Sequence, residues 1–493
     1  MALHRASEPE TFKMRKTCFL SQQKITSVLM LITSICLLLL APSSSETIDA
    51  SDSNNSKKGN ELAVVTESTL NEKSQKTVNF LLKSNADISL RFRASAPGTD
   101  WAKSDSESAV LSIFVDNNYE QDVVLWNGAS AHDYAVALGE TPAGKHKIEF
   151  RFSTLKSPKN AGSINLLGGT ITTQPYKNEL DKAVHKFAPI LIGRDKLDNN
   201  HNDTPLALYY EILKNPDHSI DISYGYVFSN EDAGDAIRPA RQQARWGRLS
   251  DIQHVFTTTI DAKFNKLDEK LEGAGHQIKK FDGRYEGTHP IIMTCTKNNM
   301  VTDNNLNLCA EDSLRFHMLP DFELKQNEPM GELMRLNTLW FLISAKELER
   351  EKKIMSDDEW TSIPPRLWKV LLSCEKMPDP RRYVYVQYDA TNPDRSPVAI
   401  QITLNNNEVY SSDFDSPDTA LCRSGWCQTA VLIPSNTRDS DIKEISVQAK
   451  KPTGQISKQL QAQLGHIFRL SNDFTPMEVI AHQDNANKPQ TLH

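Results

Sequence analysis

Residues 109–126 read AVLSIFVDNNYEQDVVLW, which is an apolar run, a DNN turn at 116–118 and a second apolar run. The segment DYAVALGETPAGKHKIEFRF (133–152) repeats this form and ends in an alternation that sets Ile148, Phe150 and Phe152 on one side. Short apolar runs separated by turn residues predict antiparallel strands, and their regular spacing is typical of a β-sandwich. Residues 139–145 also fit G-x-x-x-x-G-K, but they join two strands, so we interpret them as a hairpin rather than a phosphate loop.

The same pattern continues through most of the chain, so the sequence predicts a mainly β fold. We expect three successive β-sandwich-like units, with one or two helices between the second and the third. A helix is predicted over 331–353, where apolar residues recur at helical spacing: Leu333, Leu336, Trp340 and Ile343. The predicted parts are a signal peptide or signal anchor at 1–45, a disordered tether at 46–62, an N-terminal β-sandwich at 63–178, a central β-rich domain with a C-terminal helix at 179–353, a connector at 354–379, a C-terminal β-sandwich at 380–473 and a tail at 474–493.

An uncharged apolar run at 25–41 follows several basic residues and precedes the small-residue segment PSSS. This order is typical of a secretory signal peptide, although a run of this length can also act as an uncleaved membrane anchor. Either alternative predicts a secreted protein, or an extracytoplasmic one with a single-pass anchor, that contacts the membrane only through this segment. The net charge of −7 argues against nucleic-acid binding, which needs clustered Lys and Arg.

The cysteines and the sequons agree with export. Oxidising compartments favour disulfides between neighbouring cysteines, and five unrelated thiols beyond the apolar run are the alternative. We predict two bridges, which are Cys295 with Cys309 and Cys422 with Cys427. The sequons at Asn54 and Asn202 predict glycosylation if the source organism modifies such sites.

Polar and ionisable residues gather near the strand ends of the predicted central domain. Carboxylates and imidazoles are ligands of divalent metals, and loops at one end of a sandwich can bring them together. The candidate metal ligands are His201, Asp232, Asp235 and Asp251. The alternative is structural, because Asp and Asn also start turns. A divalent metal is the cofactor that this pattern suggests.

Residues 185–300 resemble the secreted necrosis-and-ethylene-inducing-peptide family and a related vacuolar-sorting-associated β-sandwich family. The resemblance rests on the early FAPI segment (187–190), the Tyr-rich strand at 224–228 and the stretch GRLSDIQHV (247–255), which aligns with the family's G-H-R-H-D-W-E motif. Asp251 matches the motif, whereas Ile252 and Gln253 replace its Trp and Glu. The resemblance implies a β-sandwich, Asp251 as a metal ligand, and metal-assisted glycolipid binding with membrane damage.

Exposed aromatic residues favour a non-enzymatic protein that binds a glycan or another cell-surface ligand. Amphipathic rings supply large contact areas at binding sites, and sugar rings can stack on them. The candidates are Trp426, in a short segment between two cysteines, and Trp126 in the first unit, with Trp101 and Tyr134 nearby in the sequence.

The main alternative is a metal-assisted hydrolase with its site in the central domain and the outer sandwiches as targeting modules. Acid–base work needs two positioned groups, for which the candidates are Asp251 with His254 or Asp232 with Asp235. This hypothesis requires them to converge with at least one of three histidines, which are His201, His276 and His289. A third alternative is a purely structural or secretion-associated protein, and the sequence leaves the choice between binding and catalysis open.

Overall fold

The computed structural model describes residues 60–194, 202–231, 238–304, 313–337, 339–393, 395–416, 419–449 and 460–479. All of them belong to one compact unit that spans Asn55–His493. The predicted signal segment, the sequon at Asn54 and most of the predicted tether lie outside the described residues. Within the described ranges, no helix is long and apolar enough to cross a membrane.

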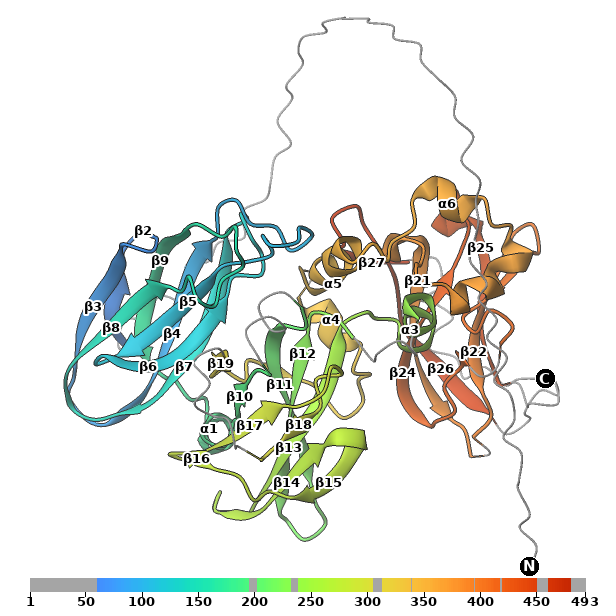
Figure 1. Ribbon diagram of the computed structural model, residues 1–493. Coiled ribbons are helices and arrows are strands. Elements are labelled where there is room, and N and C mark those ends of the chain that lie inside the picture. The colour runs from blue at the N-terminus through green and yellow to red at the C-terminus, as the bar shows by residue number, and fades with distance from the viewer. Residues whose placement is uncertain are drawn as a thin grey trace, which may run out of the picture. The chain divides into compact units, whose positions relative to one another are not determined.

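The N-terminal part of this unit is a sandwich of two antiparallel sheets, as the alternation at 109–152 predicted. One sheet has the order β1-β9-β4-β7 with β2 paired to β9, and the other has the order β3-β8-β5-β6. On β8, Ile148, Phe150 and Phe152 are all buried in the core. The strands, coloured blue to teal in Figure 1, are β1 (Glu61–Val65), β2 (Ser68–Leu70), β3 (Gln75–Leu82), β4 (Ala86–Ser95), β5 (Val110–Val115), β6 (Asn118–Val124), β7 (His132–Thr141), β8 (Gly144–Phe152) and β9 (Ile164–Thr173).

One mixed sheet forms the central part, in the order β19-β10-β17-β18-β14-β13-β12-β11-β20, with β15 paired to β14 and β16 to β17. The segments predicted as strands there are confirmed, and the short buried strand that follows Pro189 runs parallel to β17. The strands are β10 (Ile190–Ile192), β11 (Pro205–Lys214), β12 (Ile220–Phe228), β13 (Asp251–Ile260), β14 (Lys266–Gly273), β15 (Gln277–Lys280), β16 (Tyr285–Glu286), β17 (His289–Thr294), β18 (Val301–Thr302), β19 (Arg315–Phe316) and β20 (Phe322–Glu323). Two α-helices that the sequence analysis did not predict, α1 (Glu179–Lys186) and α3 (Pro239–Trp246), and the short 3₁₀ helix η3 (Ala274–His276) complete this part.

Helices connect the central sheet to a second two-sheet unit. The helix predicted over 331–353 is two helices, α4 (Glu332–Leu336) and α5 (Leu339–Arg350). Because α4 ends at Leu336, that side chain is 48% exposed instead of continuing the apolar stripe. The predicted connector then contains α6 (Asp357–Thr361) and the 3₁₀ helix η4 (Pro365–Ser373).

The C-terminal unit has sheets in the orders β24-β21-β26-β27 and β23-β22-β25. Part of the predicted tail belongs to it, because Pro476–Glu478 pairs with β26 and Val479 is fully buried. Its elements are the 3₁₀ helices η5 (Pro380–Arg382) and η7 (Asp439–Asp441) and the strands β21 (Tyr383–Thr391), β22 (Val398–Leu404), β23 (Val409–Ser411), β24 (Gly425–Leu432), β25 (Ile442–Ala449), β26 (Gln461–Leu470) and β27 (Pro476–Glu478).

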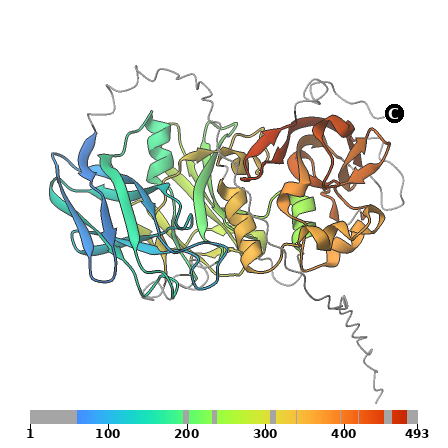
Figure 2. The ribbon, with the colours of Figure 1, turned by 90° about the horizontal axis from the view of Figure 1, so that it is seen from above.

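Helix α3 comes from the central part of the sequence but packs on the C-terminal sheet. Figures 1 and 2 both show it, in green, among the orange strands. The Gln243 amide donates to the Tyr385 hydroxyl at 2.6 Å, and the Gln428 amide donates to the Gly247 carbonyl at 2.7 Å. These buried hydrogen bonds fasten the second sandwich to the central part.

Candidate ligand-binding cleft

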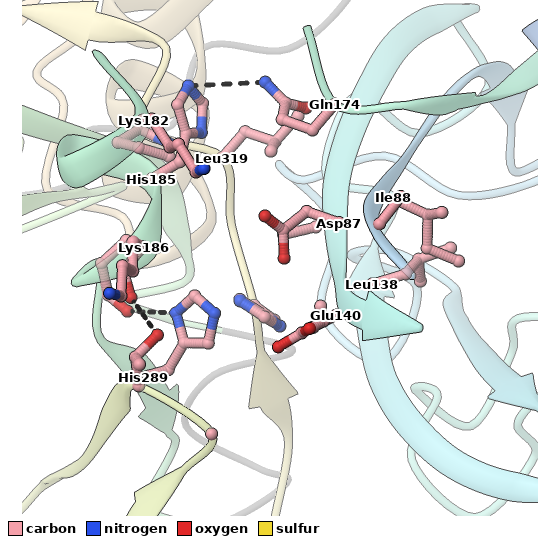
Figure 3. Close-up of a pocket in the computed structure, with 18 of the residues that line it drawn as sticks. Asp87, Ile88, Leu138, Glu140, Gln174, Lys182, His185, Lys186, His289 and Leu319 are labelled. Atoms are coloured by element: carbon pink, nitrogen blue, oxygen red, sulfur yellow. Dashed lines mark hydrogen bonds between the residues drawn. The ribbon is translucent and has the colours of Figure 1, made fainter. Parts of the chain in front are cut away.

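A cavity of about 680 Å³ lies where strands of the first sandwich meet α1, β16, β17 and the segment after β19. Figure 3 shows its two walls, with Asp87, Leu138 and Glu140 on one side and α1 with His289 on the other. Hydrogen bonds hold the walls together, since the backbone N–H of Ala137 donates to the His317 carbonyl at 2.9 Å and the His317 N–H donates to Gln121 at 3.1 Å. The cleft is therefore built from segments far apart in the sequence.

Helix α1 forms one wall of the cleft, and its sequence contains the usual signals for the start and the end of a helix. The Asn178 side chain caps it by accepting the backbone N–H of Asp181, and acidic residues in its first turn and basic residues in its last complement the helix dipole. Ala183 and Val184 are buried against the core. Residues three and four apart share a helix face, which places three side chains along the cleft: Lys182, His185 and Lys186.

Two neutral imidazoles, His289 and His317, lie in contact in the lining of the cavity. The rings of His289 and His317 pack edge to face, with centroids 4.5 Å apart. Burial lowers the pKa of each to about 4, so both are uncharged at neutral pH. His289 donates through Nδ1 to the Ala188 carbonyl at 2.9 Å, which leaves Nε2 as an acceptor, and Figure 3 shows that nitrogen directed toward the opposite wall. His317 is 1% exposed, and neither ring nitrogen has a hydrogen-bond partner among the described residues.

His185 and Gln174 add two more unpaired polar atoms. The Gln174 amide donates to His185 Nε2 at 3.4 Å, so the neutral ring carries its proton on Nδ1. That Nδ1 and the Gln174 Oε1 are buried, and no described residue pairs with either. Burial also lowers the pKa of His185 below its ordinary value. Two residues that line the cleft thus contribute one unused donor and one unused acceptor.

Four carboxylates line the same cavity. Arg315 forms ion pairs with two of these carboxylates. Its Nη2 lies 2.6 Å from Glu286 and 3.8 Å from Glu120. Burial raises the pKa of Glu120, and the Arg315 charge opposes that shift. Asp87 accepts a 2.5 Å hydrogen bond from the Tyr176 hydroxyl, and burial together with this bond raises the pKa of Tyr176. Chemically, the cleft offers donors, acceptors and negative charge to a polar ligand.

The tryptophans that the sequence analysis named as glycan-binding candidates differ in how far they are buried. Trp126 is 4% exposed and packs against His132 and Tyr134, so its ring belongs to the core and presents no face to a sugar. Trp101 is fully buried. Trp426 is half-buried on β24 rather than on a free loop, and its ring covers Gly465 of β26. Of these three tryptophans, Trp101 and Trp126 are buried and Trp426 is half-buried.

Of the predicted metal ligands and acid–base pairs, the structure describes Asp251 and His254. Asp251 is 1% exposed and accepts hydrogen bonds from Gln253 at 2.8 Å and Asn299 at 3.1 Å. His254 instead bonds to Glu272 at 2.8 Å, because residues 251 and 254 face opposite sides of the strand. In the described ranges, no group of three or more His, Cys, Asp and Glu could hold a metal ion. His201, Asp232 and Asp235 lie outside those ranges.

The hydrolase hypothesis requires at least one of His201, His276 and His289. His289 lies in the cleft, and His276 is exposed and bonded to Glu272 at 2.8 Å. The structure does not pair Asp251 with His254 as an acid and a base, because the two side chains have separate partners. Pairing of Asp232 with Asp235 concerns residues that the structure does not describe.

The predicted Cys422–Cys427 bridge is also corrected, because both carry free thiols. Cys427 is fully buried on β24, where its sulfur accepts from Arg423 Nε at 3.3 Å, while Cys422 is exposed. Cys295 is likewise a free, exposed thiol, and its predicted partner Cys309 lies outside the described residues. At the second sequon, the oxygen of Asn202 accepts from Arg350 and Thr204 is fully buried, so the folded site is poorly accessible.

Most of the cleft residues were missed by the sequence analysis, which named His289 alone. A local signal existed for α1, because Asn178 followed by acidic and then basic residues is a helix-start and helix-end pattern. No local signal marks Asp87, Glu140 or His317. Their proximity is a product of tertiary packing.

No family model matches the chain, and no curated protein matches it. Three solved structures illustrate the partial likenesses found. The CBM36-1 domain of a multidomain xylanase from the hindgut metagenome of Trinervitermes trinervoides is 8% identical, covering 24% of this chain and 93% of that one at a TM-score of 0.17. The Podospora anserina GH26-CBM35 β-(1,4)-mannanase is 12% identical, covering 26% and 28%, at 0.16. The C-terminal CBM6 of LamC from Zobellia galactanivorans is 12% identical, covering 23% and 93%, at 0.15. TM-scores of this size do not establish a shared function.

Proposed function

We propose that the protein binds a glycan in the cleft between the first sandwich and α1. The observation that carries the proposal is the set of buried polar atoms without partners along one cavity, contributed by Gln174, His185 and His317. Native proteins pair roughly 90% or more of their buried polar groups, and polar atoms left unpaired beside a cavity can bond to a ligand or to water. Sugar hydroxyls both donate and accept, and their close spacing can serve several such atoms.

The cavity's size and remaining lining support this class of ligand. Small-molecule sites generally span about 300–1,000 Å³, and 680 Å³ falls within that range. Leu138, Met318 and Leu319 provide apolar surface for the non-polar face of a sugar ring. The export predicted from the N-terminal sequence fits a glycan on a cell surface as the partner.

Binding of the purified full-length chain to a glycan array, followed by calorimetry on the hits, tests the proposal. His185→Phe and His289→Phe retain ring volume but remove the nitrogens, and each lost hydrogen bond of about 1 kcal/mol weakens binding roughly five-fold. His132→Phe is the matched control, because His132 packs against Trp126 outside the cleft. Absence of binding to any glycan, or equal losses in all three variants, would contradict the proposal.

Hydrolysis in the same cleft is a second candidate. Glu120 favours it, because burial raises the pKa of this carboxyl and a raised pKa suits a general acid. Incubation of the protein with bound glycans and an assay for new reducing ends tests for cleavage. Glu120→Gln is expected to abolish cleavage and to preserve binding, whereas unchanged cleavage would exclude Glu120 as the acid.

A further inference from the structure

Asp87 and Glu140 form a like-charged pair across two neighbouring strands. Asp87 on β4 lies directly opposite Glu140 on β7 in the antiparallel register, and both line the cleft (Figure 3). Opposed residues of an antiparallel pair share a face, with Cβ atoms about 4.5–5.5 Å apart, and like charges in this position destabilise the sheet. The structure therefore tolerates an unfavourable arrangement at this edge of the cavity.

Strands β4 and β7 also contain a cross-strand pair of opposite charges, which is the favourable arrangement. Arg93 lies opposite Asp133 in the same register, and the two form an ion pair of 2.8 Å. Neither Asp87 nor Glu140 has an ion-pair partner among the residues that the structure describes, and the donor to Asp87 is the neutral Tyr176 hydroxyl. Lys182 and Lys186 also line the cavity, but neither forms an ion pair in the described part of the chain.

A second observation at this place points independently to a ligand. His317 is 1% exposed, lines the same cavity and uses neither ring nitrogen in a hydrogen bond to a described residue. Its closest carboxylate contact is 3.8 Å, from Nδ1 to Glu120, which is beyond hydrogen-bond length. Its ring approaches to 3.9 Å of the position that a Cβ on Gly139, the neighbour of Glu140, would occupy. The two carboxylates and the unpaired ring nitrogens of His317 therefore line the same cavity.

We propose that the cleft takes a ligand with a protonated amine, and that Asp87 and Glu140 bind the ammonium group. This inference rests on the proposed glycan binding, because the rest of the ligand is taken to be a sugar. The ligand class is therefore an amino sugar with a free amino group. An ammonium has three donors and replaces the repulsion between the carboxylates with charge-assisted hydrogen bonds. A calcium ion would need six to eight oxygen ligands, and the described residues contain no group of three or more His, Cys, Asp and Glu that could hold a metal ion.

The test measures binding to matched sugars in free-amine, N-acetylated and hydroxyl forms, with spermidine as an amine that is not a sugar. We expect the wild type to bind free-amine forms at least ten-fold tighter than N-acetylated ones. Asp87→Asn and Glu140→Gln should each reduce this preference, and the double variant should remove it. Asp133→Asn, on the same strand as Glu140 but outside the cleft, should preserve it.

Thermal unfolding separates loss of the site from loss of the fold. Because Glu140→Gln removes one of two repelling charges, it should unfold at or above the wild-type temperature without ligand. Asp87→Asn also relieves the repulsion but weakens the hydrogen bond from the Tyr176 hydroxyl, so it should unfold close to the wild-type temperature. Equal binding of free-amine and N-acetylated sugars would overturn the amine assignment while leaving glycan binding intact. Spermidine binding that depends on both carboxylates, without binding of any sugar, would support the amine site and refute the glycan. Absence of binding to every probe would overturn both.

Discussion

The indole Nε1 of Trp101 donates a 2.9 Å hydrogen bond to Oε2 of Glu347, and both side chains are fully buried. Trp101 follows β4 in the first sandwich, and Glu347 lies on α5, 246 positions later. The same carboxylate accepts from the Ser229 hydroxyl at 2.5 Å and the Asp203 backbone N–H at 3.2 Å, and it pairs with Arg350 at 3.2 Å. One buried carboxyl group thus joins the first sandwich, the central sheet and α5.

Removal of this carboxylate should strongly destabilise the protein. Glu347→Ala leaves the Trp101 and Ser229 donors without their acceptor and removes one of the two carboxylates beside Arg350, the other being Glu107 at 3.9 Å. Breaking a buried pair in this way typically costs about 3–5 kcal/mol. Glu347→Gln keeps an acceptor and should cost less. Urea denaturation followed by tryptophan fluorescence measures both, and Glu349→Ala, an exposed change on the same helix, should stay within about 0.5 kcal/mol of wild type. Similar effects at positions 347 and 349 would show that the network does not stabilise the fold.

The same residue predicts how stability changes with pH. Desolvation by burial raises the pKa of Glu347 from 4.5 to about 7, although Arg350 and the Ser229 hydroxyl favour the charged form. The folded state therefore binds more protons than the unfolded state between about pH 4.5 and 7, and the free energy of unfolding contributed by Glu347 falls as pH rises through that window. The difference between wild type and Glu347→Gln in urea titrations at several pH values isolates this contribution. A difference that grows in favour of wild type as pH rises would contradict the raised pKa.

Local patterns were sufficient to predict many of the strands. In HKIEFRF (146–152), the period of two sets Ile148, Phe150 and Phe152 inward, and the structure buries all three. That signal is local because a half-buried strand must alternate apolar and polar residues. The helix at 331–353 was predicted as one element but is interrupted after Leu336, because local spacing does not show where packing ends a helix.

The cleft could not be predicted in the same way. Asp87 and Glu140 meet through strand register, and His317 reaches them through the bridge between Val136 and Met318, so no window of sequence contains the site. The sequence-based choice of Asp251 rested on its place near a strand end and on a motif resemblance, and the structure gives that residue a buried hydrogen-bonding role. Trp126 was a candidate because aromatic residues bind sugars, but the same hydrophobicity suits the core that it occupies.

The thiols should react according to their burial. Native alkylation is expected to modify Cys422 and Cys295, which are exposed, and to leave Cys427, which is fully buried, unmodified. Denaturation without reductant should then make Cys427 reactive, because the structure holds it as a free thiol. Peptide mass spectrometry identifies the modified positions. Failure of both Cys422 and Cys427 to react in denaturant, with a mass lower by two hydrogens, would instead support the bridge that the sequence spacing predicted.

A comparison of alanine substitutions at Gly247 and Gly275 separates the cost of backbone strain from the cost of close packing. Gly247 has φ of 59° after α3, and a Cβ there would lie 2.9 Å from the Thr429 carbonyl oxygen and 2.8 Å from Gln428 Cγ. Gly275 has φ of 71°, but a Cβ there would meet nothing within 4 Å. Both alanine variants carry the left-handed strain of about 1–2 kcal/mol, whereas Gly247→Ala also forces α3 away from β24, for which overpacking costs a further 1–3 kcal/mol or so. Urea denaturation of both variants should show the larger loss at Gly247, and equal losses would mean that α3 can shift on the C-terminal sheet without cost.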